Sequence, residues 1–248
     1  MCDSNGCPEM TNPVRRSFLR HSMTAALALA AGGALPAGLA VARTASPPKP
    51  QNVLDPDAAL ARLTEGNARY VSGVTRRHDF SAERPALAQG QNPYAAVLGC
   101  ADSRVIPEYA FDCARGDLFV ARVAGNFADD DMIGSLEYAV QVLAVPLILV
   151  LGHEQCGAVS AAVRAVTESA RYPGQIGSLV SAIAPAVEKV RSQPGDLLAA
   201  ATAQNVRDTM AALAARSDII GQAVKAGQAR IVGGVYRLGT GQVDFLAG

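Results

Sequence analysis

Short apolar runs alternate along the chain with longer stretches in which apolar positions recur every three or four residues. Runs that are apolar at nearly every position and only five to seven residues long are typical of strands buried on both faces. Because helical segments separate these runs, the pattern predicts an α/β fold with a mainly parallel sheet and helices on both faces. The four expected strands are Ala95–Gly99, Leu118–Ala124, Leu147–Leu151 and Arg230–Val235.

Helix and turn signals surround these strands. Asp55 followed by Pro56 is typical of a helix cap with proline at the first helical position, and apolar spacing continues the helix to Tyr70. Ser81 is expected to cap a second, short helix that ends near Gly90. A turn at residues 238–241 predicts that residues 242–246 return as an antiparallel edge strand. Further helices are expected at residues 132–143, 158–168, 177–191 and 197–216.

Length and charge limit the kind of protein. The chain has 248 residues, half of them hydrophobic, which is enough for one domain with a full core, and no internal repeat is visible. Lysine and arginine together number 22, and aspartate and glutamate also number 22. A neutral chain without a basic run argues against nucleic acid as a partner.

The first 42 residues form a separate unit in the sequence. Arg15 and Arg16 precede Phe-Leu and an apolar stretch rich in alanine, and Ala40-Val41-Ala42 is typical of a cleavage site. This segment resembles a twin-arginine signal peptide, which implies the twin-arginine translocase as a partner and a periplasmic or secreted protein. A membrane anchor or a cytosolic helix is the alternative. Residues 43–54 are then expected to be a linker, and residues 55–248 the folded domain.

Cysteine usage follows from that division. Cys2 and Cys7 would leave with the signal peptide, and the mature chain would keep Cys100, Cys113 and Cys156. An odd number of cysteines in an oxidising compartment argues against a disulfide framework. We expect a metal to hold two of them as thiolates and Cys113 to be a small buried residue.

Candidate metal ligands follow two of the expected strands. Cys100 and Asp102 come after the first strand, and His153 and Cys156 come after the third. Two thiolates, an imidazole and a carboxylate are zinc ligands. Ligands in open α/β sheets bind beyond the carboxyl ends of the strands, so one ion reaches both segments only if the first and third strands are neighbours. The expected strand order is therefore 2-1-3-4, with the antiparallel strand at the edge.

Arg104 favours a catalytic zinc over a structural one. A guanidinium two residues from Asp102 can hold its carboxylate in a bidentate pair and turn it away from the ion, which leaves a position for water. Asp102 would then orient a hydroxide that zinc makes available near neutral pH. The alternative is a closed zinc site with two cysteines, the histidine and Asp102 as ligands, which only stabilises the fold.

Five stretches of the sequence together resemble the β-class carbonic anhydrases. The resemblance runs from about Asp55 to the C-terminus in the order of the family. It implies reversible hydration of CO₂ to bicarbonate and a proton, one Zn²⁺ per subunit on Cys100, His153 and Cys156, and Asp102 with Arg104 as a gating dyad. The matching stretches are Cys100–Val105, Gly116–Asn126, Gly134–Val140, Gly152–Val159, and Gly233–Tyr236 with Thr240-Gly241.

The same resemblance implies a substrate pocket and a dimer. Gln91 matches the amide that faces the substrate in the plant-like branch, Phe119 and Tyr138 match residues that line the apolar pocket, and Gly157 is expected beside the substrate. Tyr138 would reach into the site of a partner subunit, and the first helix of the domain would cover that partner. Each pocket residue has a plain alternative, because Gln91 can cap a turn and the two aromatic residues can belong to the core.

Two departures and several other functions remain open at this stage. Val123 replaces an asparagine that is usual in the family, and Arg237 stands where aspartate is common. Hydrolysis of CS₂ or COS would use the same ligands, and a zinc-binding or bicarbonate-sensing protein without activity is a further alternative. A thiol hydrolase that uses Cys156 and His153 is the last, and it would stay active without zinc.

Overall fold

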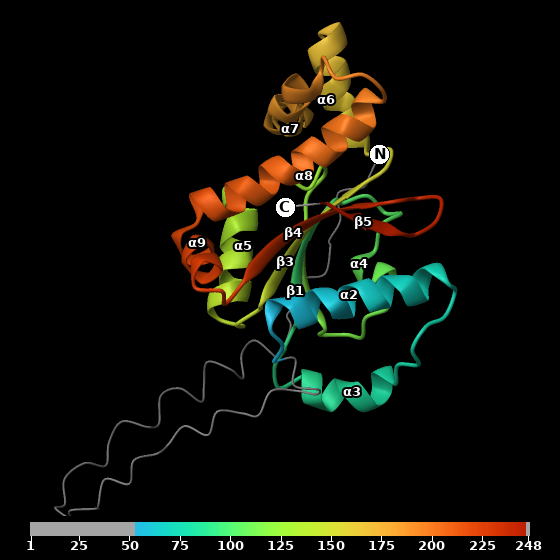
Figure 1. The fold of residues 1–248 in the computed structure, drawn as a ribbon, viewed down its shortest axis with the longest axis vertical. Coiled ribbons are helices and arrows are strands. Elements are labelled where there is room, and N and C mark those ends of the chain that lie inside the picture. The colour runs from blue at the N-terminus through green and yellow to red at the C-terminus, as the bar shows by residue number, and fades with distance from the viewer. Residues whose placement is uncertain (1–52, 247–248) are drawn as a thin grey trace, which may run out of the picture. The chain divides into compact units, whose positions relative to one another are not determined.

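The computed structural model describes residues 53–246, which form a five-stranded sheet surrounded by helices (Figure 1). The strands are β1 (Ala95–Gly99), β2 (Leu118–Arg122), β3 (Leu147–His153), β4 (Arg230–Tyr236) and β5 (Val243–Phe245). The helices are α2 (Pro56–Val71), α3 (Phe80–Leu87), α4 (Pro107–Ala110), α5 (Asp130–Gln141), α6 (Gly157–Glu168), α7 (Ile176–Val190), α8 (Leu197–Arg216) and α9 (Asp218–Lys225). The expected signal peptide and most of the expected linker lie outside the described residues.

The sheet has the expected topology. Its strand order is β2-β1-β3-β4-β5, with parallel pairing from β2 through β4 and antiparallel pairing between β4 and β5. β1 and β3 are buried at every position, which explains why both read as continuous apolar runs. The prediction that the first and third strands are neighbours is confirmed.

Helices cover both faces of the sheet. On one face, α2 and α4 enclose a core that includes Leu63, Phe111 and Leu149. On the other face, α5, α8 and α9 enclose a second core that includes Leu136, Ile148 and Leu213. A third apolar cluster joins α6, α7 and the start of α8, and α6 and α7 lie beyond the carboxyl ends of the strands (Figure 1). This third cluster includes Cys100 and Cys156.

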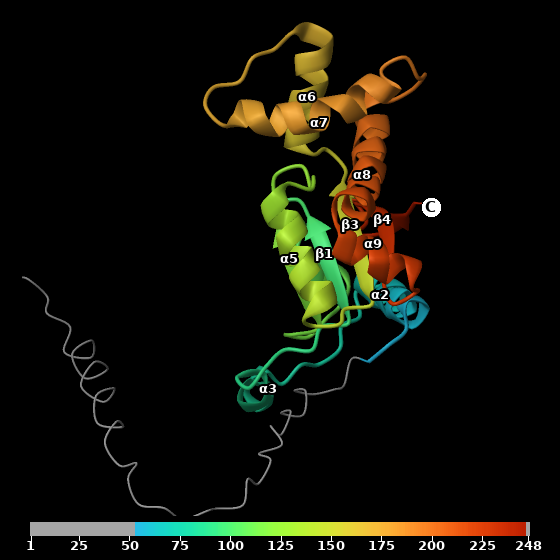
Figure 2. The same ribbon diagram turned by 90° about the vertical axis from the view of Figure 1, so that its left-hand side faces the viewer.

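Side-chain caps fix where several helices begin. The carboxylate of Asp55 accepts a hydrogen bond from the amide of Ala58 at 2.7 Å and starts α2 where expected. The expectation for the next helix was wrong, because Asp79 and not Ser81 caps α3. The carboxylate of Asp79 accepts from the amides of residues 81 and 82, so the helix begins and ends earlier than predicted. No residue of α3 is buried, and the helix stands apart from the sheet (Figure 2).

Several further boundaries differ from the predictions, three of them near the metal ligands or at a helix cap. Helix α5 begins at Asp130, two residues earlier than predicted, because the carboxylate of Asp129 caps it by accepting a hydrogen bond from the amide of Met132. β2 ends at Arg122, and the chain then turns through Gly125 and Asn126, both of which have positive φ angles. β3 continues to His153, since β4 pairs with it up to Tyr236. The helices α4 and α9 were not predicted. Among residues 53–246, no helix is both long enough and apolar enough to span a bilayer.

Candidate metal centre

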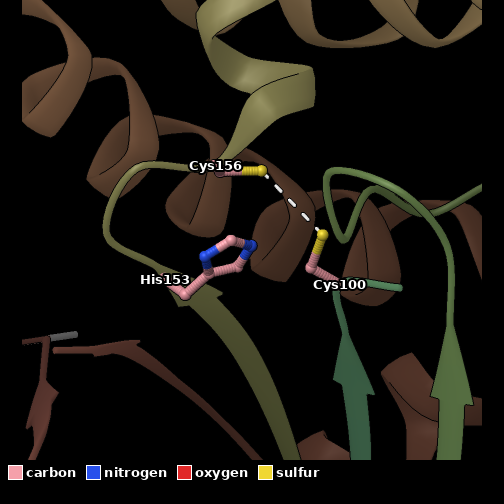
Figure 3. Close-up of side chains that lie close together, drawn as sticks. All are labelled: Cys100, His153 and Cys156. Carbon is pink, nitrogen blue, oxygen red and sulfur yellow. Dashed lines mark hydrogen bonds between the residues drawn. The ribbon is translucent and has the colours of Figure 1, made fainter. Parts of the chain in front are cut away.

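Three potential metal ligands meet at the carboxyl ends of two neighbouring strands. Cys100 directly follows β1, and His153 is the last residue of β3. Cys156 is the N-cap residue of α6. Figure 3 shows the imidazole of His153 and both thiols pointing toward one another. The strand order β2-β1-β3 therefore brings together the two sequence segments that we expected to share an ion.

The spacing of the ligand atoms fits a zinc ion. The sulfur atoms of Cys100 and Cys156 lie 3.9 Å apart, and the two sulfurs and a ring nitrogen of His153 all lie within 4.8 Å of one another. Zinc–sulfur bonds of about 2.3 Å at a tetrahedral angle separate two sulfurs by about 3.8 Å. A disulfide needs about 2.05 Å, and both thiols are free.

The protein fixes the tautomer of His153 that a metal needs. The Nδ1 atom lies 2.8 Å from the backbone carbonyl oxygen of Glu154, and because a carbonyl can only accept, Nδ1 carries the proton. The lone pair of Nε2 is then free, and Nε2 is buried without a hydrogen-bond partner among the described residues. A buried imidazole nitrogen without a partner is costly, so this atom indicates a missing ligand.

Backbone amides and a helix end favour thiolates at this site. The amide of Gly125 donates to the sulfur of Cys100 at 3.3 Å, and Cys156 lies at the N-terminus of α6. A hydrogen bond shared with Cys156, with burial opposing it, holds the pKa of Cys100 well below its usual range. The same hydrogen bond, together with burial, raises the pKa of Cys156. The pair therefore favours a thiolate at Cys100, and a divalent ion would favour the thiolate form of both cysteines.

Asp102 and Arg104 form a closed pair beside the ligands. Arg104 donates from Nε to Oδ1 at 2.9 Å and from Nη2 to Oδ2 at 2.7 Å, and its own amide also donates to Oδ1. The guanidinium is held in turn by the carbonyl of Gln155 at 3.3 Å. These hydrogen bonds hold the pKa of Asp102 well below its usual range. Oδ2 of Asp102 lies 3.8 Å from Nε2 of His153, so the carboxylate faces the position that the metal would take.

Arg122 supports the ligand loop and was not identified from the sequence. From the last position of β2, it donates to the carbonyl oxygens of Cys100 at 2.8 Å, Asp102 at 2.6 Å and Val105 at 3.0 Å. Three carbonyls of one loop thus point at a single guanidinium, which fixes the path of the chain between β1 and α4. A charged residue at the end of an otherwise apolar strand was the only signal in the sequence.

The expected pocket residues do not surround the metal ligands of their own chain. Phe119 pairs with Ala96 at the start of β1, about 13 Å along the strand from Cys100 at about 3.3 Å per residue. The ring of Tyr138 lies 6.3 Å from that of Phe119 and is 47% exposed. Gln91 is exposed in the loop before β1. Only Gly157, the first residue of α6, is adjacent to a ligand, and open space lies where its side chain would be.

Comparison with known proteins agrees with this geometry. Residues 95–243 match the family model described as carbonic anhydrase. A carbonic anhydrase of Mycolicibacterium smegmatis is 43% identical over 192 residues, which cover 77% of this chain and 93% of the relative. The chain belongs to the β-carbonic anhydrase family. The motif between β1 and α4 and the motif between β3 and α6 both lie inside the matched region.

Solved structures of β-carbonic anhydrases share the fold. The β-carbonic anhydrase CcaA is 27% identical, with a TM-score of 0.58 over 76% of this chain and 99% of that chain. A chain from the crystal structures of two tetrameric β-carbonic anhydrases of Sordaria macrospora is 22% identical to this chain. The two superpose with a TM-score of 0.62, over 77% of this chain and 98% of the other. At that identity the second likeness concerns the fold alone.

Proposed function

We propose that this β-carbonic anhydrase carries out zinc-dependent, reversible hydration of CO₂ to bicarbonate and a proton. The observation that carries the proposal is the buried, unpartnered Nε2 atom of His153 beside two thiols at the spacing of zinc ligands. Cys100, His153 and Cys156 would hold the ion, which when bound supplies a hydroxide nucleophile near neutral pH. CO₂ carries no charge, so a nucleophile and an apolar approach suffice for the reaction.

Asp102 and Arg104 have distinct roles in this proposal. Arg104 occupies both carboxylate oxygens of Asp102, which keeps this residue ionised and holds it beside the ligand position without adding it to the ligand group. The carboxylate can then accept a hydrogen bond from the nucleophile and orient it toward the carbon atom of CO₂. This arrangement distinguishes a catalytic centre from a closed structural zinc site, in which Asp102 would be the fourth ligand.

The substrate pocket is proposed to form between two subunits. Phe119 and Tyr138 lie near the amino ends of the strands, whereas the metal ligands lie at the carboxyl ends. Tyr138 of α5 and Val142, the residue that follows this helix, form an apolar patch that a second copy can cover, and they are 47% and 60% exposed. A homodimer would bring Phe119, Tyr138 and Gln91 of one subunit toward the ligands of the other. Gln91, which matches the amide of the plant-like branch, also favours that branch.

One measurement tests the reaction. Stopped-flow CO₂ hydration is recorded from neutral to alkaline pH, with the zinc content measured on the same sample. We expect activity that scales with zinc, and Cys156→Ser should lose both zinc and activity, whereas Cys113→Ser keeps both. Stoichiometric zinc without CO₂ hydration at any pH would contradict the proposal in favour of a non-catalytic zinc protein. Faster hydrolysis of CS₂ or COS than hydration of CO₂ would reassign the substrate.

A mixing experiment tests the shared pocket. The Cys156→Ser variant lacks a metal ligand, and the Tyr138→Ala variant lacks the ring that would serve the neighbouring subunit. Co-expression of the two variants should produce heterodimers with one intact site, so activity should exceed the sum of the two inactive homodimers. Activity that does not rise on mixing, in a sample shown to contain heterodimers, would contradict a pocket built from both subunits.

We also propose export by the twin-arginine route. The proposal is supported by Arg15 and Arg16 before the alanine-rich stretch and by the small residues that end at Ala42. Cell fractionation should find the mature chain in the periplasm or the medium. Replacement of both arginines by lysine should leave the uncut precursor inside the cell. An unchanged distribution in that variant would contradict the proposal.

A further inference from the structure

A cavity with a mainly basic lining lies at the opposite end of the sheet from the metal centre. Its volume is about 180 Å³, and it is lined by residues of α2, of the segment after α2, and of the loop between α4 and β2. Tyr94, directly before β1, and Asp117, directly before β2, place it at the amino ends of these strands. Basic side chains dominate the lining: Arg62, Arg69, Arg76, Arg77 and His78.

The two acidic groups of this cavity are already paired. Asp112 accepts from Nε of Arg69 at 2.6 Å and from the backbone amide of Arg76 at 3.1 Å. Asp117 accepts from Nη2 of Arg62 at 3.2 Å and from the amide of Ala114 at 2.9 Å. Among residues 53–246, four arginines and two carboxylates line the cavity, so two of its positive charges have no counter-charge in that part of the chain.

The groups that carry this surplus lie next to each other in the chain. Neither guanidinium of Arg76 and Arg77 takes part in a hydrogen bond or ion pair within residues 53–246, and both residues are exposed. The Nε2 atom of His78 is buried and has no hydrogen-bond partner in that part of the chain. Two guanidinium forks and one buried imidazole nitrogen therefore line the cavity without a hydrogen-bond partner among residues 53–246.

We propose that this cavity binds a small inorganic oxyanion with two negative charges, phosphate or sulfate. Arginine forks donate in the planar, paired geometry that tetrahedral oxyanions accept. The volume of about 180 Å³ matches a small oxyanion, and a larger groove that shares Arg76, His78 and Asp112 lies next to it. The surplus of two charges decides in favour of a dianion over a monoanion such as bicarbonate or chloride. This site is independent of the proposed reaction, because it shares no residue with the metal centre.

Calorimetric titration of the full-length, zinc-loaded protein with inorganic phosphate at constant ionic strength tests this site. We expect saturable binding of one phosphate per chain, and the double variant R76Q/R77Q should weaken it at least about tenfold, since each charge-assisted hydrogen bond is strong. Sulfate should compete with phosphate. The double variant R171Q/K225Q removes two exposed charges elsewhere and should leave the affinity unchanged.

Three results would overturn the proposal. One is the absence of saturable phosphate binding. Another is equal affinity in R76Q/R77Q and the wild type, which would assign the phosphate to the zinc ion or to another surface. The last is binding of bicarbonate that is as tight as binding of phosphate, which would contradict a site for dianions. None of these readouts depends on CO₂ hydration, so the site and the proposed reaction can fail separately.

Discussion

Arg104 holds both carboxylate oxygens of Asp102, with Nε 2.9 Å from Oδ1 and Nη2 2.7 Å from Oδ2. A carboxylate held in this way lies beside the ligand cluster without joining it, since the three atoms that converge come from Cys100, His153 and Cys156. In the proposed reaction, the residues that would bind the metal are therefore distinct from the pair that would prepare the nucleophile.

We expect Asp102→Asn to keep zinc and to lose activity. The amide cannot form the same charged pair with Arg104 and is a weaker acceptor for the nucleophile, so CO₂ hydration should fall about ten- to hundredfold. Stopped-flow rates and zinc content should be measured together. Asp208→Asn removes a carboxylate that pairs with Lys189 away from the centre and is the matched control. Wild-type turnover in the Asp102 variant would contradict the role of the pair.

Arg122→Lys should weaken zinc binding although no ligand is changed. Lysine cannot donate to three carbonyls in the fork geometry of arginine, so the loop that carries Cys100 and Asp102 would lose its support. The zinc dissociation constant should rise about ten- to hundredfold, as it does when supporting residues of metal sites are lost. Competition with a chelator measures this constant. Arg191→Lys, at an exposed pair with Glu188, should change nothing.

Cys113 should resist alkylation in the folded protein. Burial raises the pKa of its thiol to about 12, and its sulfur lies 3.1 Å from the hydroxyl of Tyr94. Thiolate is the reactive form, so iodoacetamide at pH 8 should label Cys113 only after unfolding in urea, as measured by peptide mass spectrometry. Labelling of Cys113 in the native protein at the rate of a free thiol would contradict this expectation.

The same shift predicts how stability depends on pH. The thiol of Cys113 ionises near pH 9 in the unfolded chain but near pH 12 in the folded protein. The unfolded state therefore releases its proton first, and this contribution to the free energy of unfolding is complete below pH 9 and is lost between pH 9 and 12. Urea unfolding across that range should show a steeper fall for the wild type than for Cys113→Ala.

Two helical glycines should respond in opposite directions to alanine. A Cβ atom at Gly66 in α2 would lie 1.9 Å from the carbonyl oxygen of Phe111, so Gly66→Ala should destabilise the protein by about 2–3 kcal/mol. A Cβ atom at Gly134 in α5 would meet nothing within 4 Å. Gly134→Ala should therefore stabilise the protein by about 0.5–1 kcal/mol, the helix propensity difference. Thermal and urea unfolding measure both, and equal effects would contradict the packing argument.

The strand order of the sheet could be predicted from the sequence, because a shared metal site requires two particular strands to be neighbours. Cys100 and His153 could share an ion only if β1 and β3 were neighbours, and the structure confirms that pairing. Boundaries were less predictable because they depend on specific caps. Aspartate and serine both cap helices well, so the sequence alone does not show whether Asp79 or Ser81 begins α3. α4 has four residues and α9 has eight, so each is too short for a clear helical period.

The supporting contacts of the metal centre could not be predicted in the same way. The amide of Gly125 reaches the sulfur of Cys100 only because the chain turns with φ +89° at Gly125 and +43° at Asn126. The carbonyl of Glu154 reaches His153 because β3 continues to this histidine, two residues beyond the expected end. Such contacts depend on backbone angles that residue types and spacing leave open.

The two cysteines that face each other at the centre are separated by 56 positions in the chain. In an unfolded polypeptide, only His153 and Cys156 are close enough in sequence to bind one zinc ion together. The complete set of three ligands forms only after β1 and β3 have paired. Loading with a zinc ion would therefore be a late event in maturation. A transport route that moved unfolded chains would have to deliver zinc after translocation, whereas a route that moves finished proteins could load it beforehand.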